Sequence, residues 1–162
     1  MDTLILVNPE SGKGRGRKLL GSIRQYTEEN GINCQIRITK HRGHATEIIS
    51  KESSEFQKIV ITGGDGTVSE AINGLDPAIE TKLGLLPIGS GNDFARALGL
   101  PRFLNDNLKL VFKDAPNYLS TDIGKVRIFT EPKDLVKTNL FLKELVLDTK
   151  VLQLEKFVST RH

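Results

Sequence analysis

The sequence predicts an α/β fold, a doubly wound and mostly parallel sheet with glycine-rich loops at the carboxyl ends of its strands. Apolar runs of strand length occur at residues 3–7, 58–62 and 83–88. Each run is nearly continuous rather than alternating, which is typical of strands buried on both faces of a parallel sheet. Segments with helical spacing separate the runs, and strands that alternate with helices form parallel sheets. A glycine-bearing turn follows each run.

The remaining elements complete a β-α-β-α-β order. Apolar residues 19, 20, 23 and 26 have helical spacing and Gly31 follows, so a helix is expected over residues 18–30. Residues 34–39 alternate as in a strand. Further helices are expected from His44 and over residues 68–73, 93–98 and 104–112, with a strand from Tyr118. Mixed apolar spacing predicts one or two helices in residues 134–143 and 144–157.

Length and glycine content suggest where the α/β unit ends. The chain has 162 residues, of which 38% are hydrophobic, enough for one ordinary domain with a buried core. All 15 glycines lie at or before Gly124. We therefore expect an α/β domain over residues 1–126 and a divergent tail over residues 127–162.

Charge and cysteine content restrict the possible partners and location. The 23 basic and 20 acidic residues are interspersed, apart from the basic cluster at residues 12–18, which argues against a nucleic-acid partner. The single cysteine, Cys34, lies in an alternating segment and is interpreted as a buried strand residue rather than a nucleophile. No segment resembles a signal peptide or a membrane span. We expect a cytoplasmic protein.

Three loops carry the glycines that matter for chemistry: "NPESGKGRG", "GGDGT" and "IGSGNDFARALGLP". Loops at the carboxyl ends of parallel strands meet at one crevice, where ligands bind. Glycine lets the backbone approach phosphate oxygens, and the helix N-terminus behind each loop attracts anions. A carboxylate among phosphates is repelled unless it binds a cation, a ribose hydroxyl or a reacting proton, so Asp65 predicts a magnesium-linked or general-base role. The alternative is that these glycines only shape tight turns.

Two common phosphate-binding fingerprints are missing from these loops. The first loop does not satisfy the G-x-x-x-x-G-K-[ST] pattern of a Walker loop. No G-x-G-x-x-G dinucleotide fingerprint follows the first strand either. The phosphate interpretation therefore depends on the three loops acting together.

Four segments in this order, "VNPESGKGRG", "GHATEI", "GGDGTVSEAING" and "LPIGSGNDFARALGLP", resemble the N-terminal catalytic domain of the diacylglycerol kinase family, especially the soluble bacterial lipid kinases. The likeness covers residues 2–126. NAD kinases share the "GGDGT" loop, but the first and last segments resemble the lipid kinases instead. The resemblance implies the NAD kinase and diacylglycerol kinase type of N-terminal fold.

The resemblance also implies an ATP-dependent kinase that uses Mg²⁺, with Asp65 as the catalytic residue and no metal ligand assigned. Its acceptor would be a lipid hydroxyl, such as that of diacylglycerol, at a membrane surface where the protein is peripheral. The residues implied to bind ATP are Asn8, Pro9, Glu10, Ser11, Gly12, Thr39, Gly63, Gly64, Asp65, Gly66, Thr67, Glu70, Ser90, Asn92 and Asp93.

The likeness ends near Val126, where the family continues into a second, mostly β domain that contributes lipid-binding surface, magnesium-linked carboxylates and the general base. Residues 127–162 carry no matching motif and are too short for that domain. We therefore expect a truncation or a shifted reading frame, and weak or no lipid kinase activity. The alternatives are a catalytically inert nucleotide-binding remnant or regulatory module and, less favoured, an NAD kinase-like enzyme. An exposed sheet edge would favour a homo-oligomer.

A few other residues allow two interpretations. His41 and His44 have the spacing of a metal pair, but without a nearby cysteine or third histidine we favour a helix start beside the phosphate cleft. Arg15 and its basic neighbours are interpreted as a solvated helix face rather than an anion-attracting one. Arg96 is expected to pair with Asp93.

Overall fold

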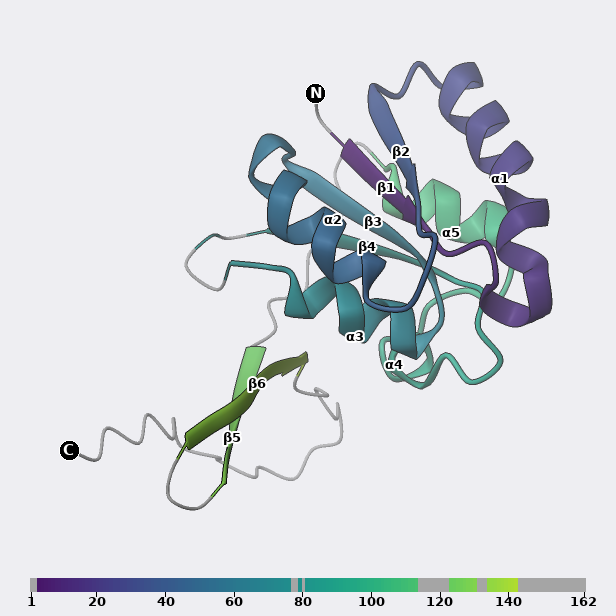
Figure 1. Cartoon of the computed structure of the whole chain (residues 1–162). Coiled ribbons are helices and arrows are strands. Elements are labelled where there is room, and N and C mark those ends of the chain that lie inside the picture. The colour runs from purple at the N-terminus through teal and green to yellow at the C-terminus, as the bar shows by residue number, and fades with distance from the viewer. Residues whose placement is uncertain (1–2, 77–78, 80, 114–122, 131–133, 143–162) are drawn as a thin grey trace, which may run out of the picture.

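The computed structural model describes residues 3–76, 79, 81–113, 123–130 and 134–142. Its main sheet has four strands in the order β2-β1-β3-β4, and all neighbouring pairs are parallel (Figure 1). The strands are β1 (Thr3–Val7), β2 (Cys34–Ile38), β3 (Lys58–Gly63) and β4 (Lys82–Pro87). The predicted doubly wound, mostly parallel α/β fold is confirmed.

Helices cover both faces of this sheet (Figure 1). They are α1 (Ser11–Glu29), α2 (His44–Glu52), α3 (Asp65–Asn73), α4 (Asp93–Ala97) and α5 (Leu104–Val111), with a 3₁₀ turn at Ser53–Glu55. One core forms between the sheet and α2 and α3, and a second between the sheet and α1 and α5. Leu4 and Leu6 of β1 face the first core, whereas Ile5 and Val7 face the second. This alternation explains why the strand is buried at every position and apolar from Leu4 to Val7, since each face is covered.

Two helices begin earlier than the sequence predicts. Helix α1 begins at Ser11 instead of residue 18, but Gly12, Lys13 and Gly14 have left-handed φ values of 62°, 61° and 82°. The first loop is therefore a left-handed turn joined to the front of a regular helix. Helix α3 begins at Asp65 instead of residue 68, so the "GGDGT" loop contributes the first turn of the helix itself.

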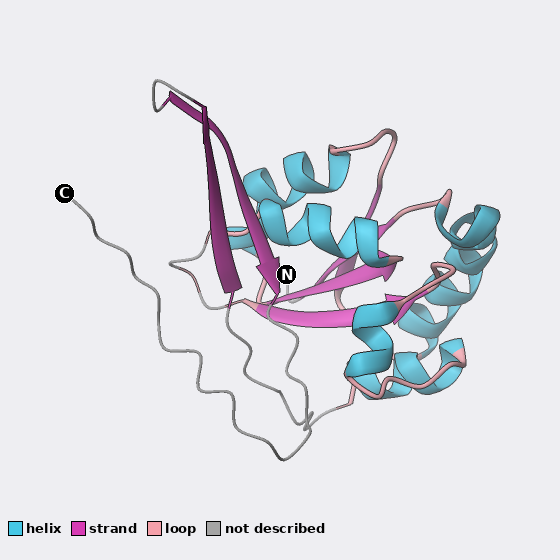
Figure 2. Ribbon diagram, turned by 90° about the horizontal axis from the view of Figure 1, so that it is seen from below, coloured by secondary structure: helices cyan, strands magenta, loops and turns pink. Residues whose placement is uncertain are grey.

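A separate antiparallel hairpin follows, made of β5 (Ile123–Thr130) and β6 (Asp134–Leu142) (Figure 2). The helix predicted for residues 134–143 is wrong, because pairing with β5 supplies hydrogen bonds that periodicity cannot foresee, and Val136, Thr138 and Phe141 favour strands. Strand β5 crosses the 126/127 position where the sequence predicts a domain boundary. The predicted start of this strand at Tyr118 and the predicted helix over residues 144–157 lie outside the described residues.

Two other expectations concern single elements. Cys34 lies in β2 and is half-buried against the second core, as a strand residue with a free thiol. Among the helices of the described residues, none combines the length and apolarity needed to cross a membrane.

Lys58, at the start of β3, connects the sheet to the C-terminal end of α5. Its Nζ donates a hydrogen bond to the backbone carbonyl of Val111 at 2.8 Å and lies 5.5 Å from the centre of the Phe112 ring. A cation near the carbonyl end of a helix is favourable. Burial, and then the neighbouring positive charge of Lys82, lower the pKa of Lys58. The folded state therefore holds this proton less tightly than the unfolded chain does.

This difference predicts a pH dependence of stability. Because the folded pKa of Lys58 lies below the unfolded value of about 10.4, the unfolded chain binds more protons in the interval between the two, and Lys58 makes the free energy of unfolding rise with pH there. A Lys58→Met variant should lack this contribution, which urea unfolding at several alkaline pH values measures. The exposed lysine of α5, in the variant Lys109→Met, is the control and should follow the wild type; equal pH slopes for all three proteins would contradict the prediction.

Candidate functional site

The carboxyl ends of the four strands are aligned at one edge of the sheet. Just beyond the strands, the N–H groups of Thr39, Asn8 and Ile88 donate to the carbonyl oxygens of Val7, Thr62 and Gly63, at 2.9, 2.9 and 3.0 Å respectively. These bonds extend the parallel ladder one step past each strand. The loops after β1, β3 and β4 therefore emerge side by side, with the buried Thr39 at the end of β2 beside them.

The order β2-β1-β3-β4 places the reversal of winding between β1 and β3, where open parallel sheets bind ligands. A hydrogen bond crosses this position: the Asn8 Nδ2 donates to Thr67 Oγ1 at 2.9 Å. The Ser11 hydroxyl lies 3.4 Å from the same oxygen, and Asn8 Oδ1 accepts from the Glu10 N–H at 3.0 Å. These bonds fix the first loop to the start of α3.

Several glycines at this edge are explained by contacts within the protein. A Cβ added at Gly64 would lie 3.0 Å from the Cα of Gly89, and one at Gly89 would lie 2.6 Å from the Cα of Gly64. A Cβ at Gly12 would lie 1.9 Å from the Ile88 carbonyl oxygen, and one at Gly63 would lie 2.5 Å from the Cβ of Thr67. The loops are therefore packed backbone against backbone. The sequence analysis assigned these glycines to phosphate approach and did not foresee the contacts between loops.

Gly66 differs from its neighbours in the "GGDGT" loop. It is exposed, its φ is not in the left-handed region, and a Cβ there would meet no atom of the described residues within 4 Å. The N–H groups of Thr67 and Val68 bond to the carbonyl oxygen of Gly64 at 2.9 and 3.1 Å. The N–H groups of Asp65 and Gly66, in the first turn of α3, have no hydrogen-bond partner among the residues that the structure describes. The space in front of Gly66 can therefore admit an anion to a helix N-terminus.

Asp65 anchors the neighbouring helix α4. Its two carboxylate oxygens accept the N–H groups of Asp93 and Phe94, at 3.1 and 3.2 Å. A carboxylate from another element thus takes the place of a capping side chain, since Asn92 at the N-cap makes no such bond itself. Each oxygen keeps a further lone pair, so Asp65 can still face a cation.

The loop before α4 brings further predicted residues close to Asp65. Asn92 has a left-handed φ of 54°, its Nδ2 donates to the Gly89 carbonyl at 2.9 Å, and its buried Oδ1 has no partner among the described residues. A Cβ added at Gly91 would lie 3.3 Å from an Asp65 carboxylate oxygen and 3.6 Å from an Asp93 one. Two carboxylates therefore flank Gly91, which is a donor set that suits a hard cation such as Mg²⁺. The expected pair of Asp93 and Arg96 is present.

The other predicted residues lie around this edge without side-chain hydrogen bonds to Asp65 or Thr67 among the described residues. Ser90 is exposed in the third loop, and Glu70 is half-buried one turn after Thr67 in α3. Glu10 is exposed and forms a salt bridge with Arg17 at 2.5 Å, where both side chains are more than 70% exposed. A pair so exposed contributes little to stability. The Pro9 carbonyl accepts from the Arg17 N–H at 3.1 Å, within the turn.

Arg15 is the residue that the sequence analysis misjudged. Its guanidinium donates to the carbonyl oxygens of Gly12 and Gly89, at 3.2 and 3.0 Å, and so joins the first loop to the third. The sequence shows that Arg15 directly follows the loop glycines. It does not show the contact with Gly89, which is 74 residues further along the chain. Arg15 is therefore part of the loop assembly rather than a freely solvated helix face.

Comparison with known proteins identifies the family. The model of the diacylglycerol kinase catalytic domain matches residues 2–126 of the chain. The chain belongs to the diacylglycerol kinase catalytic domain family. This match confirms the family resemblance that the four sequence segments suggested, and its extent over residues 2–126.

Similarity to individual proteins supports this family assignment. The diacylglycerol kinase of Bacillus subtilis is 43% identical over 101 residues, covering 60% of this chain and 33% of the relative. The diacylglycerol kinase of Staphylococcus carnosus is 32% identical over 125 residues, covering 75% of this chain and 40% of the relative. The crystal structure of a diacylglycerol kinase from Bacillus anthracis superposes with a TM-score of 0.61 at 32% identity, covering 78% of this chain and 44% of that one. The chain thus spans less than half the length of these relatives.

The glycine contacts predict opposite effects of two alanine substitutions in one loop. Gly63→Ala should lower the free energy of unfolding by about 1–3 kcal/mol, because the new methyl group overlaps Thr67. Gly66→Ala should raise it by about 0.5–1 kcal/mol, because alanine is the better helix residue and nothing described obstructs it. Urea unfolding of both variants tests this, and equal effects of the two substitutions would contradict the assignment of contacts.

The anchoring role of Asp65 predicts a local structural defect in its variants. Asp65→Ala removes two charge-assisted hydrogen bonds and should lower the free energy of unfolding by about 1–3 kcal/mol. The Asp93 and Phe94 amides should then exchange their hydrogens faster, which NMR measures residue by residue. The exposed carboxylate of α5, in the variant Asp106→Ala, is the control. Unchanged exchange at Asp93 and Phe94 would show that Asp65 does not hold α4.

Proposed function

We propose that residues 1–126 are a domain that binds Mg-ATP at the strand-end edge between β1 and β3, within a lipid kinase. The observation that carries the proposal is the combination of the Asn8–Thr67 bond across the reversal point with open space in front of Gly66. The bond holds the first loop at the helix N-terminus, and the open space leaves that terminus accessible. Family membership supports the same assignment.

The geometry suits the phosphates of a nucleotide. The N–H groups of Asp65 and Gly66 would bind phosphate oxygens, helped by the partial positive charge at the N-terminus of the nine-residue helix α3. Ser11 and Thr67 present hydroxyl groups at the same place. Lys13, exposed at the tip of the left-handed turn, supplies a positive charge at the rim. The remaining predicted nucleotide-binding residues would complete the cleft around these groups.

Magnesium fits the carboxylates around Gly91. Asp65 and Asp93 would hold the ion, directly or through its water ligands, and the ion would neutralise charge on the phosphates when bound. In phosphoryl transfer the protein mainly positions the groups and stabilises charge. Asp65 would thus both fasten α4 and orient the metal side of the nucleotide.

The reaction that we propose for the family fold transfers the γ-phosphate of ATP to a lipid hydroxyl, such as that of diacylglycerol, and leaves ADP. The acceptor would lie at a membrane surface, with the protein peripheral to it in the cytoplasm. All four sequence motifs of this chain contribute to the nucleotide-binding part of the site that we propose, and none to the lipid-binding part. We therefore expect nucleotide binding from the chain of 162 residues but little transfer to lipid on its own. A nucleotide-binding module without turnover is the second candidate, and NAD kinase-like transfer to a soluble acceptor is the third.

Calorimetric titration of the purified chain with Mg-ATP tests the proposal. Wild type should bind, and Gly66→Ala should weaken binding by about tenfold or more, which corresponds to about 1.4 kcal/mol, because the methyl group fills the phosphate space. Gly21→Ala is a matched control, since Gly21 also lies in a helix with open space around it, but in α1. Its affinity should equal that of the wild type.

The outcomes separate the candidate functions. Failure of the wild type to bind Mg-ATP, or equal affinities of the wild type and Gly66→Ala, would overturn the nucleotide site. Transfer of radiolabelled phosphate from ATP to diacylglycerol in mixed micelles at ordinary kinase rates would contradict the expected low turnover. Slow but measurable transfer to diacylglycerol would favour the lipid kinase, transfer to NAD would favour the NAD kinase-like enzyme, and binding with no transfer to either acceptor would favour the nucleotide-binding module.

A further inference from the structure

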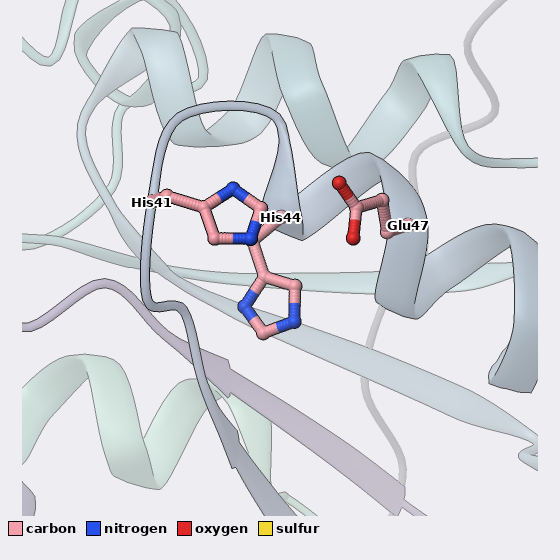
Figure 3. Close-up of side chains that lie close together, drawn as sticks. All are labelled: His41, His44 and Glu47. Atoms are coloured by element: carbon pink, nitrogen blue, oxygen red, sulfur yellow. The ribbon is translucent and has the colours of Figure 1, made fainter.

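A cluster of three possible metal ligands lies in the β2–α2 turn and the first turn of α2, on different residues from the carboxylates discussed above. The side chains of His41, His44 and Glu47 lie close together (Figure 3), and one possible ligand atom from each lies within 4.8 Å of the others. His41 and Glu47 are exposed, and His44 is half-buried. The sequence analysis set aside the histidine pair for want of a third ligand. Glu47 supplies that ligand.

The turn before α2 builds this cluster. Gly43 has a φ of 84°, which only glycine adopts without strain, and the His44 N–H donates to the His41 carbonyl at 3.2 Å. The resulting turn places the His41 ring against the His44 ring, with ring centres 4.7 Å apart and planes inclined by 27°. Glu47 follows His44 by three residues in α2, so both side chains lie on the same face of the helix.

The hydrogen bonds of His41 favour metal binding. Its Nδ1 lies 3.0 Å from the Arg42 carbonyl oxygen, which can only accept, so the proton is on Nδ1 and Nε2 keeps a free lone pair. Histidines that bind metals commonly donate their other ring N–H to a backbone carbonyl in this way. His41 is therefore already in the tautomer that a metal requires.

His44 has to give up one bond. Its Nδ1 accepts the Lys40 N–H at 3.0 Å, so the neutral ring carries its proton on Nε2. A metal ion bound at Nδ1 would replace the Lys40 N–H there, and an ion bound at Nε2 would require the ring proton to move to Nδ1, so the bond from Lys40 is lost in both cases. Lys40 is exposed, and water can replace the ring as the acceptor of its N–H.

We propose that His41, His44 and Glu47 bind a divalent transition-metal ion of the Zn²⁺ class. Two imidazoles and one carboxylate select zinc, nickel, copper or cobalt over Mg²⁺ and Ca²⁺, which prefer all-oxygen sites. Three protein ligands leave a fourth position for water or another small ligand. The turn begins two residues after Thr39, so a bound ion would fix the conformation of the chain beside the strand-end edge. The proposal does not depend on the nucleotide site.

Calorimetric titration of the tag-free full chain with ZnCl₂ tests this site, and the absorption spectrum of the Co²⁺ form reports the number of ligands. One ion per chain is expected. Loss of an outer-shell partner of a metal typically costs 10- to 100-fold in affinity, so removal of a ligand by His41→Ala, His44→Ala or Glu47→Gln should weaken binding by more than about tenfold. Because His41 is exposed in a turn, His41→Ala should fold normally, which circular dichroism checks.

The chain offers a matched control for each ligand type. His162→Ala removes the third histidine of the sequence, Cys34→Ser removes the one cysteine, and Glu55→Gln neutralises an exposed carboxylate in the 3₁₀ turn after α2. All three should bind Zn²⁺ as the wild type does. The proposal is overturned if the wild type does not bind Zn²⁺, if His41→Ala and Glu47→Gln bind it unchanged, or if binding is lost in His162→Ala or Cys34→Ser instead.

Discussion

The strand-end edge depends on the close approach of three loops without side chains between them. Gly64 and Gly89 lie backbone against backbone, and Gly12 packs against the carbonyl of Ile88. Arg15 then joins the first loop to the third through hydrogen bonds to backbone oxygens. Because interiors tolerate little extra volume, a methyl group at these contacts would separate the loops and open the helix N-terminus they surround. Packing between the loops, rather than ligand contact, is thus the first requirement on these glycines.

Once the loops are packed, a ligand could approach the backbone only where no protein atom fills the space in front of it. Gly66 is such a place, with its N–H in the first turn of α3 and free space beyond it. The strand order contributes independently, because the reversal of winding between β1 and β3 leaves a gap that the Asn8–Thr67 bond spans. Sheet topology, loop packing and an unobstructed helix terminus together support the binding site that we propose at this edge.

Elements set by local pattern could be predicted from the sequence, and those set by distant partners could not. The nearly continuous apolar run of β1 predicts its observed bounds, since both faces of this strand are covered and all five of its residues are buried. The strand β6 was mistaken for a helix because its pairing with β5 decides its conformation. At the site, the motif residues were foreseen, but the contact of Arg15 with Gly89 and the capping of α4 by Asp65 join segments far apart in sequence.

The position of Asp65 links stability to chemistry in one side chain. Its carboxylate holds the first amides of α4 and at the same time shares the surroundings of Gly91 with Asp93. The cation that we propose between these carboxylates would draw electron density from the same oxygens that cap the helix, and its binding would then affect the position of α4. Asp93 is also paired with Arg96, three residues later in α4. The acid in the glycine loop therefore has a structural role at the start of α4, whatever ligand the site binds.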